Sequence, residues 1–164
     1  MSTEDNKTLM RHFFEEVYTK KKLAALEEFI TPNHIDHSAA AASLPVGPEG
    51  SRQAIGMMLT AFPDLHVTVE DMIAEGDKVV TRFTSHGTQK RAFMGIPPTG
   101  KQVTVSSIVI ARIADGKIVE QWGLDDQMGM LQQLGLIPAL FGVIFLAGLA
   151  AGMGLLALLR KVLK

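Results

Sequence analysis

The chain has 164 residues, a formal net charge of −1 and no cysteine. This length suits one domain, and the balanced charge gives no electrostatic reason to bind nucleic acid. The missing thiols exclude disulfides, zinc–thiolate sites and cysteine nucleophiles. All 17 acidic residues lie at or before Asp126, and residues 127–159 carry no charge. The sequence therefore predicts a soluble body over residues 1–135 and an apolar tail over residues 136–164.

The first half of the body has the apolar spacing of helices. Apolar residues recur every three or four positions over residues 9–18, which predicts an amphipathic helix. A shorter second helix is expected over residues 23–30, ended by Pro32. Pro48 suits the first turn of a third helix, which extends to Phe62.

From residue 66 onward the apolar period changes to two, as in β-strands. Strands are expected over residues 66–70, 78–86, 102–113 and 117–124, with a short extended piece over residues 34–37. Helices followed by an antiparallel meander indicate an α+β domain, with three N-terminal helices on one face of a curved antiparallel sheet. A long C-terminal hydrophobic helix is expected to follow that domain.

Four segments of the body resemble the SnoaL-like polyketide cyclase family, also called ester cyclases, of the nuclear-transport-factor-two-like superfamily. They are Phe62-Pro63-Asp64-Leu65, the run from Met94 to Gly100, the run from Arg112 to Ile118, and the run from Asp126 to Gly135. The resemblance covers residues 6–135 and implies a cone-shaped fold with an apolar cavity. It also implies ring closure by intramolecular aldol condensation, without metal or organic cofactor, through a carboxylic acid in the cone.

The resemblance assigns the family's functional positions to residues of this chain. The family's acid/base aspartate falls on Gly123, and its histidine falls on Val109. Its glutamine corresponds to Ser107, and its asparagine corresponds to Asp36. Because glycine has no side chain that could carry a proton, the sequence leaves open whether the protein is an enzyme.

The turn at residues 114–116 decides which side chains share a face of the sheet. A three-residue loop would place Val109 opposite Gln121, and Ser107 opposite Gly123. We take that face as concave, because small residues there leave room for a ligand. A two-residue turn would swap the pairing. The expected ligand-binding residues are Ser107, Val109, Gln121, Gly123 and Met94.

Asp36 and His37 stand side by side on the extended piece near the expected cavity mouth. A carboxylate in an apolar cavity can act as a base, so Asp36 is the candidate proton-transferring group. His37 or Arg82 would support it electrostatically. The alternatives are that Asp36 turns the chain, that His37 is solvated, and that Arg82 forms an exposed or dimer-facing ion pair. The five histidines show no metal-ligand spacing, so no metal is expected.

The tail contains 23 residues, from Ile137 to Leu159, without a charged, amide or hydroxyl side chain. A helix of that length spans about 34 Å, enough for a bilayer core of about 30 Å. Residues 1–7 are polar and do not form a signal peptide. We therefore expect a membrane anchor over 137–159, or an oligomerisation segment, with the body in the cytoplasm. A helix dipping into one leaflet, a bundle of tails, or a tail folded into the cavity are the alternatives.

Two functions from different classes fit these features. The first is a membrane-tethered domain that binds a lipophilic small molecule in its apolar cone, as a scaffold or carrier. The second is a cofactor-independent cyclase or isomerase, with a rearranged acid/base acting on a polyketide- or isoprenoid-like substrate. The loss of the acid at Gly123 favours the first. Apolar residues on the outer sheet face, Ile108, Ile110 and Trp122, predict a homo-oligomer.

Overall fold

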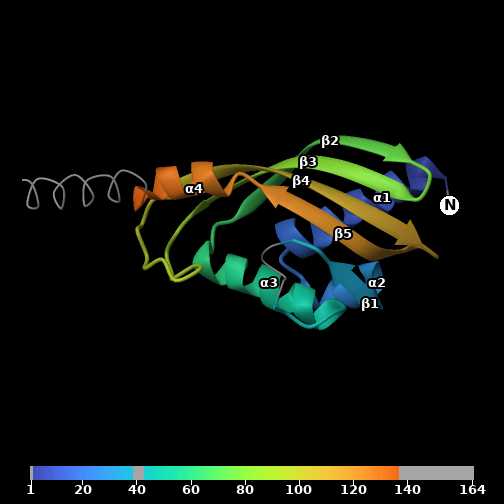
Figure 1. Ribbon diagram of the computed structural model, residues 1–164, viewed down its shortest axis with the longest axis horizontal. Coiled ribbons are helices and arrows are strands. Elements are labelled where there is room, and N and C mark those ends of the chain that lie inside the picture. Colours follow the sequence, from blue (N-terminus) through green and yellow to red (C-terminus); the bar gives the residue numbers. More distant parts are fainter. Residues whose placement is uncertain (1, 39–42, 137–164) are drawn as a thin grey trace, which may run out of the picture.

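The computed structural model describes residues 2–38 and 43–136 (Figure 1). The helices are α1 (Thr3–Phe13), which continues into a π-helical turn (Phe14–Thr19), a 3-10 turn (Leu23–Ala25), α2 (Leu26–Phe29), α3 (Pro48–Ala61) and α4 (Gln127–Leu134). The strands are β1 (Ile30–Asp36), β2 (His66–Glu75), β3 (Lys78–Thr88), β4 (Gln102–Ala114) and β5 (Lys117–Asp125).

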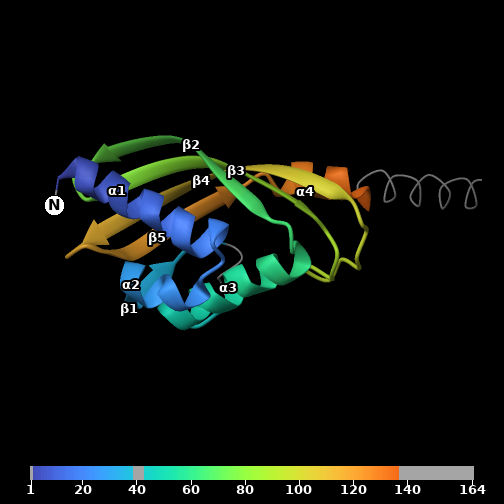
Figure 2. The same cartoon turned by 180° about the vertical axis from the view of Figure 1, so that it is seen from behind.

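The five strands form one curved sheet in the order β1-β5-β4-β3-β2. The helices α1, α2 and α3 lie on one side of this sheet (Figure 2). This confirms the predicted α+β architecture with three N-terminal helices. The sheet is not wholly antiparallel, however, because β1 runs parallel to β5. No hairpin joins these two strands, so their connection does not force opposite directions.

The boundary between α2 and β1 differs from the prediction. The helix ends at Phe29, and Ile30, expected to be helical, is the first residue of β1. Pro32 lies within that strand and does not end the helix. The sheet tolerates it because β1 is an edge strand, where a residue without an N–H need not complete the hydrogen-bond ladder.

The β4–β5 hairpin has a two-residue turn, and the predicted three-residue loop is wrong. Ala114 pairs with Lys117, and both central residues are left-handed, Asp115 at φ 49° and Gly116 at φ 74°. Asp-Gly is a favoured sequence for such a turn, because both of its residues tolerate positive φ.

A bulge follows this turn and restores the predicted face of the sheet. Ile113 pairs with Ile118 but Arg112 pairs with Glu120, which leaves Val119 as an extra residue. The same side chains therefore point to the concave side as expected. The β5 partner of each β4 residue is displaced by two residues, so that Val109 lies opposite Gly123 and not opposite Gln121.

The predicted C-terminal hydrophobic helix and membrane anchor, residues 137–159, lie outside the described residues. Within residues 2–38 and 43–136, none of the helices is long and apolar enough to cross a bilayer. The structure gives the anchor no support, and the tail stays a prediction from the sequence.

Candidate active site

A cavity of about 790 Å³ lies between the concave face of the sheet and the helices α1 and α3. This volume falls in the usual range for small-molecule pockets, about 300–1,000 Å³. Most of its wall is apolar, and the contributing side chains include Phe62, Phe83, Phe93, Val105 and Met130. The cavity therefore suits a largely apolar ligand with a few polar groups.

Six residues singled out in the sequence line this cavity. They are Asp36, Met94, Ser107, Val109, Gln121 and Gly123. Five of them come from β1, β4 and β5, and Met94 comes from the loop between β3 and β4. The strand register brings the five together, because Asp36 pairs with Gln121 and Val109 pairs with Gly123.

Asp36 is held by one donor on each carboxylate oxygen. The backbone N–H of Ser38 donates to Oδ1 at 2.8 Å, and Gln121 Nε2 donates to Oδ2 at 2.7 Å. The first bond comes from the chain just after β1, and the second comes from the neighbouring strand β5. These two bonds set the orientation of the carboxylate at the cavity wall.

A second carboxylate, Asp125, lines the same cavity. It follows Gly123 by two residues on β5 and lies opposite Ser107 on β4. Ser107 Oγ donates to Asp125 Oδ1 at 2.5 Å. The sequence analysis missed Asp125 because it ended the last strand one residue earlier, at Leu124. Extending the two-residue alternation of that strand would have found it.

Tyr18 enters the cavity from the π-helical turn after α1. Burial raises the pKa of its hydroxyl well above the usual value, and the negative charges of Asp36 and Asp125 raise it further. The phenol therefore keeps its proton and can donate a hydrogen bond to a ligand. The sequence placed Tyr18 only in the apolar stripe of a helix, and the helical spacing carried no signal for this role.

Gly123 leaves space between the two carboxylates. A Cβ built on Gly123 would touch one described atom within 4 Å, Ser38 Cβ at 3.4 Å, which is ordinary contact. Among the described residues, the position that carries the acid/base aspartate in the resembling family is thus open. Asp36 and Asp125 are the carboxylates that line the cavity in the described part of the chain.

His37 and Arg82 do not line this cavity. His37 Nε2 lies 2.8 Å from Glu120 Oε1, and its ring stacks on Trp122 at 5.1 Å between centroids. Hydrogen bonds to the Glu120 carboxylate lower its pKa, with the larger effect from His37 and a smaller one from Arg112.

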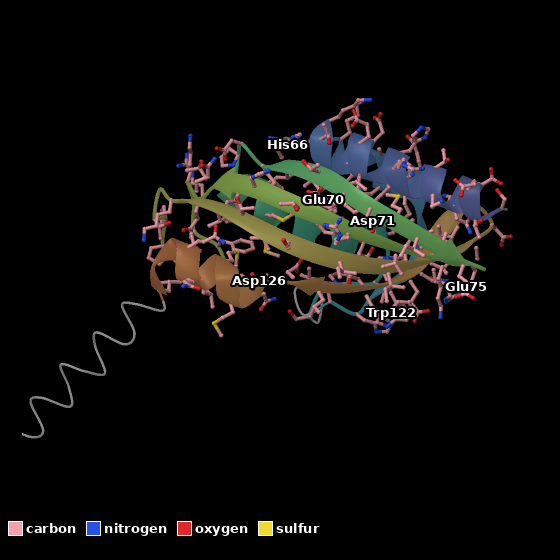
Figure 3. The ribbon with its side chains drawn as sticks, turned by 90° about the horizontal axis from the view of Figure 1, so that it is seen from above. His66, Glu70, Asp71, Glu75, Trp122 and Asp126 are labelled. Atoms are coloured by element: carbon pink, nitrogen blue, oxygen red, sulfur yellow. The ribbon has the colours of Figure 1, made fainter. Side chains whose placement is uncertain are left out.

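Arg82 is exposed on the other face of the sheet. There it lies opposite Asp71 in the pairing of β3 with β2. Figure 3 shows Asp71 and Trp122 on this face. His37 and Arg82 are therefore both separated from the cavity wall that carries Asp36.

Asp126 caps α4 by accepting a hydrogen bond from the backbone N–H of Gly129 at 2.8 Å. In residues 2–38 and 43–136 no three His, Cys, Asp or Glu side chains gather in a way that could hold a metal ion.

The family model described as SnoaL-like polyketide cyclase matches residues 8–134. The nogalonic acid methyl ester cyclase of Streptomyces nogalater is 27% identical over 111 residues, which cover 67% of this chain and 83% of the relative. Among solved structures, TsrD from Streptomyces laurentii is 31% identical with a TM-score of 0.76, and the match covers 83% of this chain and 98% of TsrD. IdmH from Streptomyces antibioticus is 34% identical with a TM-score of 0.68, over 79% of this chain and 98% of IdmH.

Proposed function

Because this chain belongs to the SnoaL-like polyketide cyclase family, we propose that it closes or isomerises a ring in a polyketide- or isoprenoid-like substrate without a cofactor. One observation carries the proposal: Asp36 and Asp125 reach an apolar cavity on either side of the open position at Gly123. The pair takes over the work of the family's missing aspartate. The nogalonic acid methyl ester cyclase indicates the kind of substrate, a polyketide ester.

Asp36 is the base in this reaction. An intramolecular aldol step removes a proton from a carbon next to a carbonyl, and that carbon then bonds to a second carbonyl carbon. The second carbonyl oxygen takes up a proton, which the protonated Asp36 returns, so no atom is gained or lost and the base is regenerated. Asp36 accepts the first proton, and the bonds from Gln121 and the Ser38 backbone hold its carboxylate toward the cavity.

The protonated hydroxyl of Tyr18 stabilises the oxygen that becomes negative. It lines the same cavity and lies near both carboxylates. A donor aimed at a developing oxyanion in an apolar site commonly contributes a factor of about 10²–10³ in rate. The apolar walls strengthen this interaction because they exclude water.

The test uses the full-length protein and nogalonic acid methyl ester, the compound after which the Streptomyces nogalater relative is named. Mass spectrometry after chromatography should detect a product of the same mass and a new retention time. In D₂O the substrate should also exchange hydrogen for deuterium at the carbon next to the carbonyl, which loses its proton to the base. Asp36→Asn keeps the shape of the side chain, and it should lower both rates by about 10²–10⁴-fold.

The matched control is Asp71→Asn, which changes the same residue type on the opposite face of the sheet, and both rates should stay unchanged. Unaltered turnover in Asp36→Asn would exclude Asp36 as the base.

A second function, binding without turnover, is supported by the residues at Gly123 and Val109, which lack the family's proton-carrying side chains. In that case the cavity holds or carries a lipophilic molecule. Native mass spectrometry would then find the polyketide ester bound to the protein, while neither ring closure nor deuterium uptake would occur.

A further inference from the structure

The end of β1 directs two neighbouring side chains to opposite faces of the sheet. Asp36 lines the cavity, whereas His37, the next residue, does not. Successive side chains of an extended chain point to opposite faces, and the His37 ring lies against Trp122 on the outer face (Figure 3). A contact that fixes His37 on the outer face therefore also constrains the backbone that carries Asp36.

The backbone at the end of β1 is held to the sheet by few hydrogen bonds of its own. β1 is an edge strand, and its register with β5 is interrupted between Ile30 and Ile35. Pairing then continues only through Asp36, after which the His37 N–H donates to the Gln121 carbonyl at 2.9 Å. A short stretch of edge pairing opens at little cost, because few bonds have to break.

Side chains on the outer face add a second set of contacts to this strand end. His37 Nε2 lies 2.8 Å from Glu120 Oε1. An ionised carboxylate only accepts hydrogen bonds, so Nε2 carries a proton and donates it. Arg112 on β4 binds the other oxygen, Glu120 Oε2, through Nε at 2.9 Å and Nη2 at 2.8 Å. The His37 ring also stacks on Trp122, with 9° between the ring planes.

These contacts connect the last residue after β1 to both β5 and β4. Glu120 is held from two sides, and its side chain is only 20% exposed, so its position on the sheet is well defined. It therefore gives His37 a fixed partner. The stacked indole of Trp122 restricts the same ring from a second direction.

We propose that His37 is a positioning residue, whose contacts on the outer face hold the end of β1 where Asp36 reaches the cavity. This inference rests on the proposed function, in which Asp36 is the base. Ser38 follows His37 directly, and its N–H donates to Asp36 Oδ1 at 2.8 Å. Fixing His37 therefore also fixes a donor to the carboxylate. Proton transfer needs the base within hydrogen-bond reach of the carbon acid, so a displaced strand end would slow the reaction.

The first test measures hydrogen exchange by NMR in the full-length protein and does not depend on turnover. His37→Ala removes the ring and its two contacts. The protection factors of the amides at residue 37 and Ser38 should fall by about threefold to tenfold, the effect of one partly exposed hydrogen bond to a charged group. His37→Gln keeps an N–H that can donate to Glu120 and should keep both protection factors within about twofold of the parent.

The matched control is His66→Ala. His66 is also an exposed histidine of the outer face, and its ring stacks on His86 with 6.3 Å between centroids, but it lies on the opposite edge strand, β2. This variant should leave the protection of residue 37 and Ser38 unchanged. Parental protection factors in His37→Ala would overturn the inference, whether or not any substrate is turned over.

The second test is a double-mutant cycle in the turnover assay. His37→Ala should lower kcat by about threefold to tenfold and leave KM unchanged, because the ring does not line the cavity. In the Asp36→Asn background, His37→Ala should change kcat by less than about twofold, since His37 acts only through Asp36. Two effects that multiply would overturn the proposal.

The variant His37→Gln separates position from charge. Because its amide is neutral, a role of imidazolium charge would be lost in this variant, whereas a positioning role keeps kcat within about twofold of the parent. If His37→Gln is as slow as His37→Ala while both remain folded, the hydrogen bond to Glu120 is not what matters and the proposal is wrong. If the parent turns nothing over while the protection factors fall as expected, the proposed function fails and the role of His37 in holding β1 stands.

Discussion

Ser107 and Asp125 face each other across β4 and β5, and the hydroxyl of Ser107 donates to the Asp125 carboxylate at 2.5 Å. The strand pairing inferred from the sequence placed Ser107 opposite Gly123. The two-residue turn and the bulge at Val119 each displace this pairing by one residue, so that the partner is Asp125. That displacement brings the second carboxylate to the cavity.

Asp125 should contribute to turnover. Asp125→Asn keeps the shape of the side chain and its contact with Ser107 but removes the negative charge near Tyr18. We expect kcat to fall by about tenfold to a hundredfold with little change in melting temperature. Glu70→Gln, on β2 away from the cavity lining, is the control for the loss of one carboxylate. If Asp125→Asn and Glu70→Gln both have the kcat of the parent, Asp125 has no part in the reaction.

The stability of the protein should depend on His34 below about pH 6.5. Because burial lowers the pKa of His34 in the folded state, the unfolded chain binds the proton more readily. The stability that the protein gains from keeping His34 neutral is therefore fully present above the pKa of His34 in the unfolded chain, about 6.5. It is lost as the pH falls through the lower pKa of His34 in the folded state.

Urea unfolding between pH 5 and pH 7.5 should therefore show a decline of stability on the acid side for the parent. His34→Phe should show a smaller decline over the same range. Parallel curves for the two proteins would mean that His34 does not titrate on unfolding.

The loop between β3 and β4 is held by Gln89, which is fully buried. Its Oε1 accepts from the backbone N–H and the hydroxyl of Thr99, at 3.2 and 2.7 Å, and its Nε2 donates to the carbonyl of Ile96 at 3.3 Å. This loop carries Phe93 and Met94 to the cavity wall.

Gln89→Leu should lower the free energy of unfolding by about 1–3 kcal/mol, because it leaves partly buried polar groups of the loop without partners. Ligand affinity should fall as well. Gln102→Leu, exposed at the start of β4, is the matched control and should change stability by less than about 0.5 kcal/mol. Chemical denaturation of the three proteins measures the difference, and equal stabilities would contradict this account of the loop.

The outer face of the sheet should mediate association. Ile73, Val80, Ile110 and Trp122 are successive cross-strand partners there, and Ile73 and Trp122 are 65% and 36% exposed. An apolar row of this kind commonly marks an interface. Residues 1–135 alone should sediment as a dimer, and Ile110→Glu should shift them to monomer. Met128→Glu, on α4, adds the same charge outside this row and should leave the dimer intact. A monomeric parent fragment would show that this face has no self-partner.

Local patterns in the sequence were enough to predict the fold and part of the cavity wall. The apolar periods identify the helices and strands, and alternation along β4 and β5 places Ser107, Val109, Gln121 and Gly123 on one face. The motifs from Phe62 to Gly135 lead to the family and to Asp36. Each of these inferences depends on residues close together in the chain, where spacing alone decides which side chains share a surface.

Asp125, Tyr18 and His34 take their roles from contacts between distant segments. Asp125 meets Ser107 only because the two-residue turn and the bulge at Val119 together displace the register of the hairpin, which reassigns every partner along the strand. Tyr18 reaches the carboxylates because α1 ends in a π-helical turn packed over the sheet. His34 is buried on the edge strand β1, which adds in parallel to β5. These contacts depend on how separate elements pack, which the spacing of residues within each element does not determine.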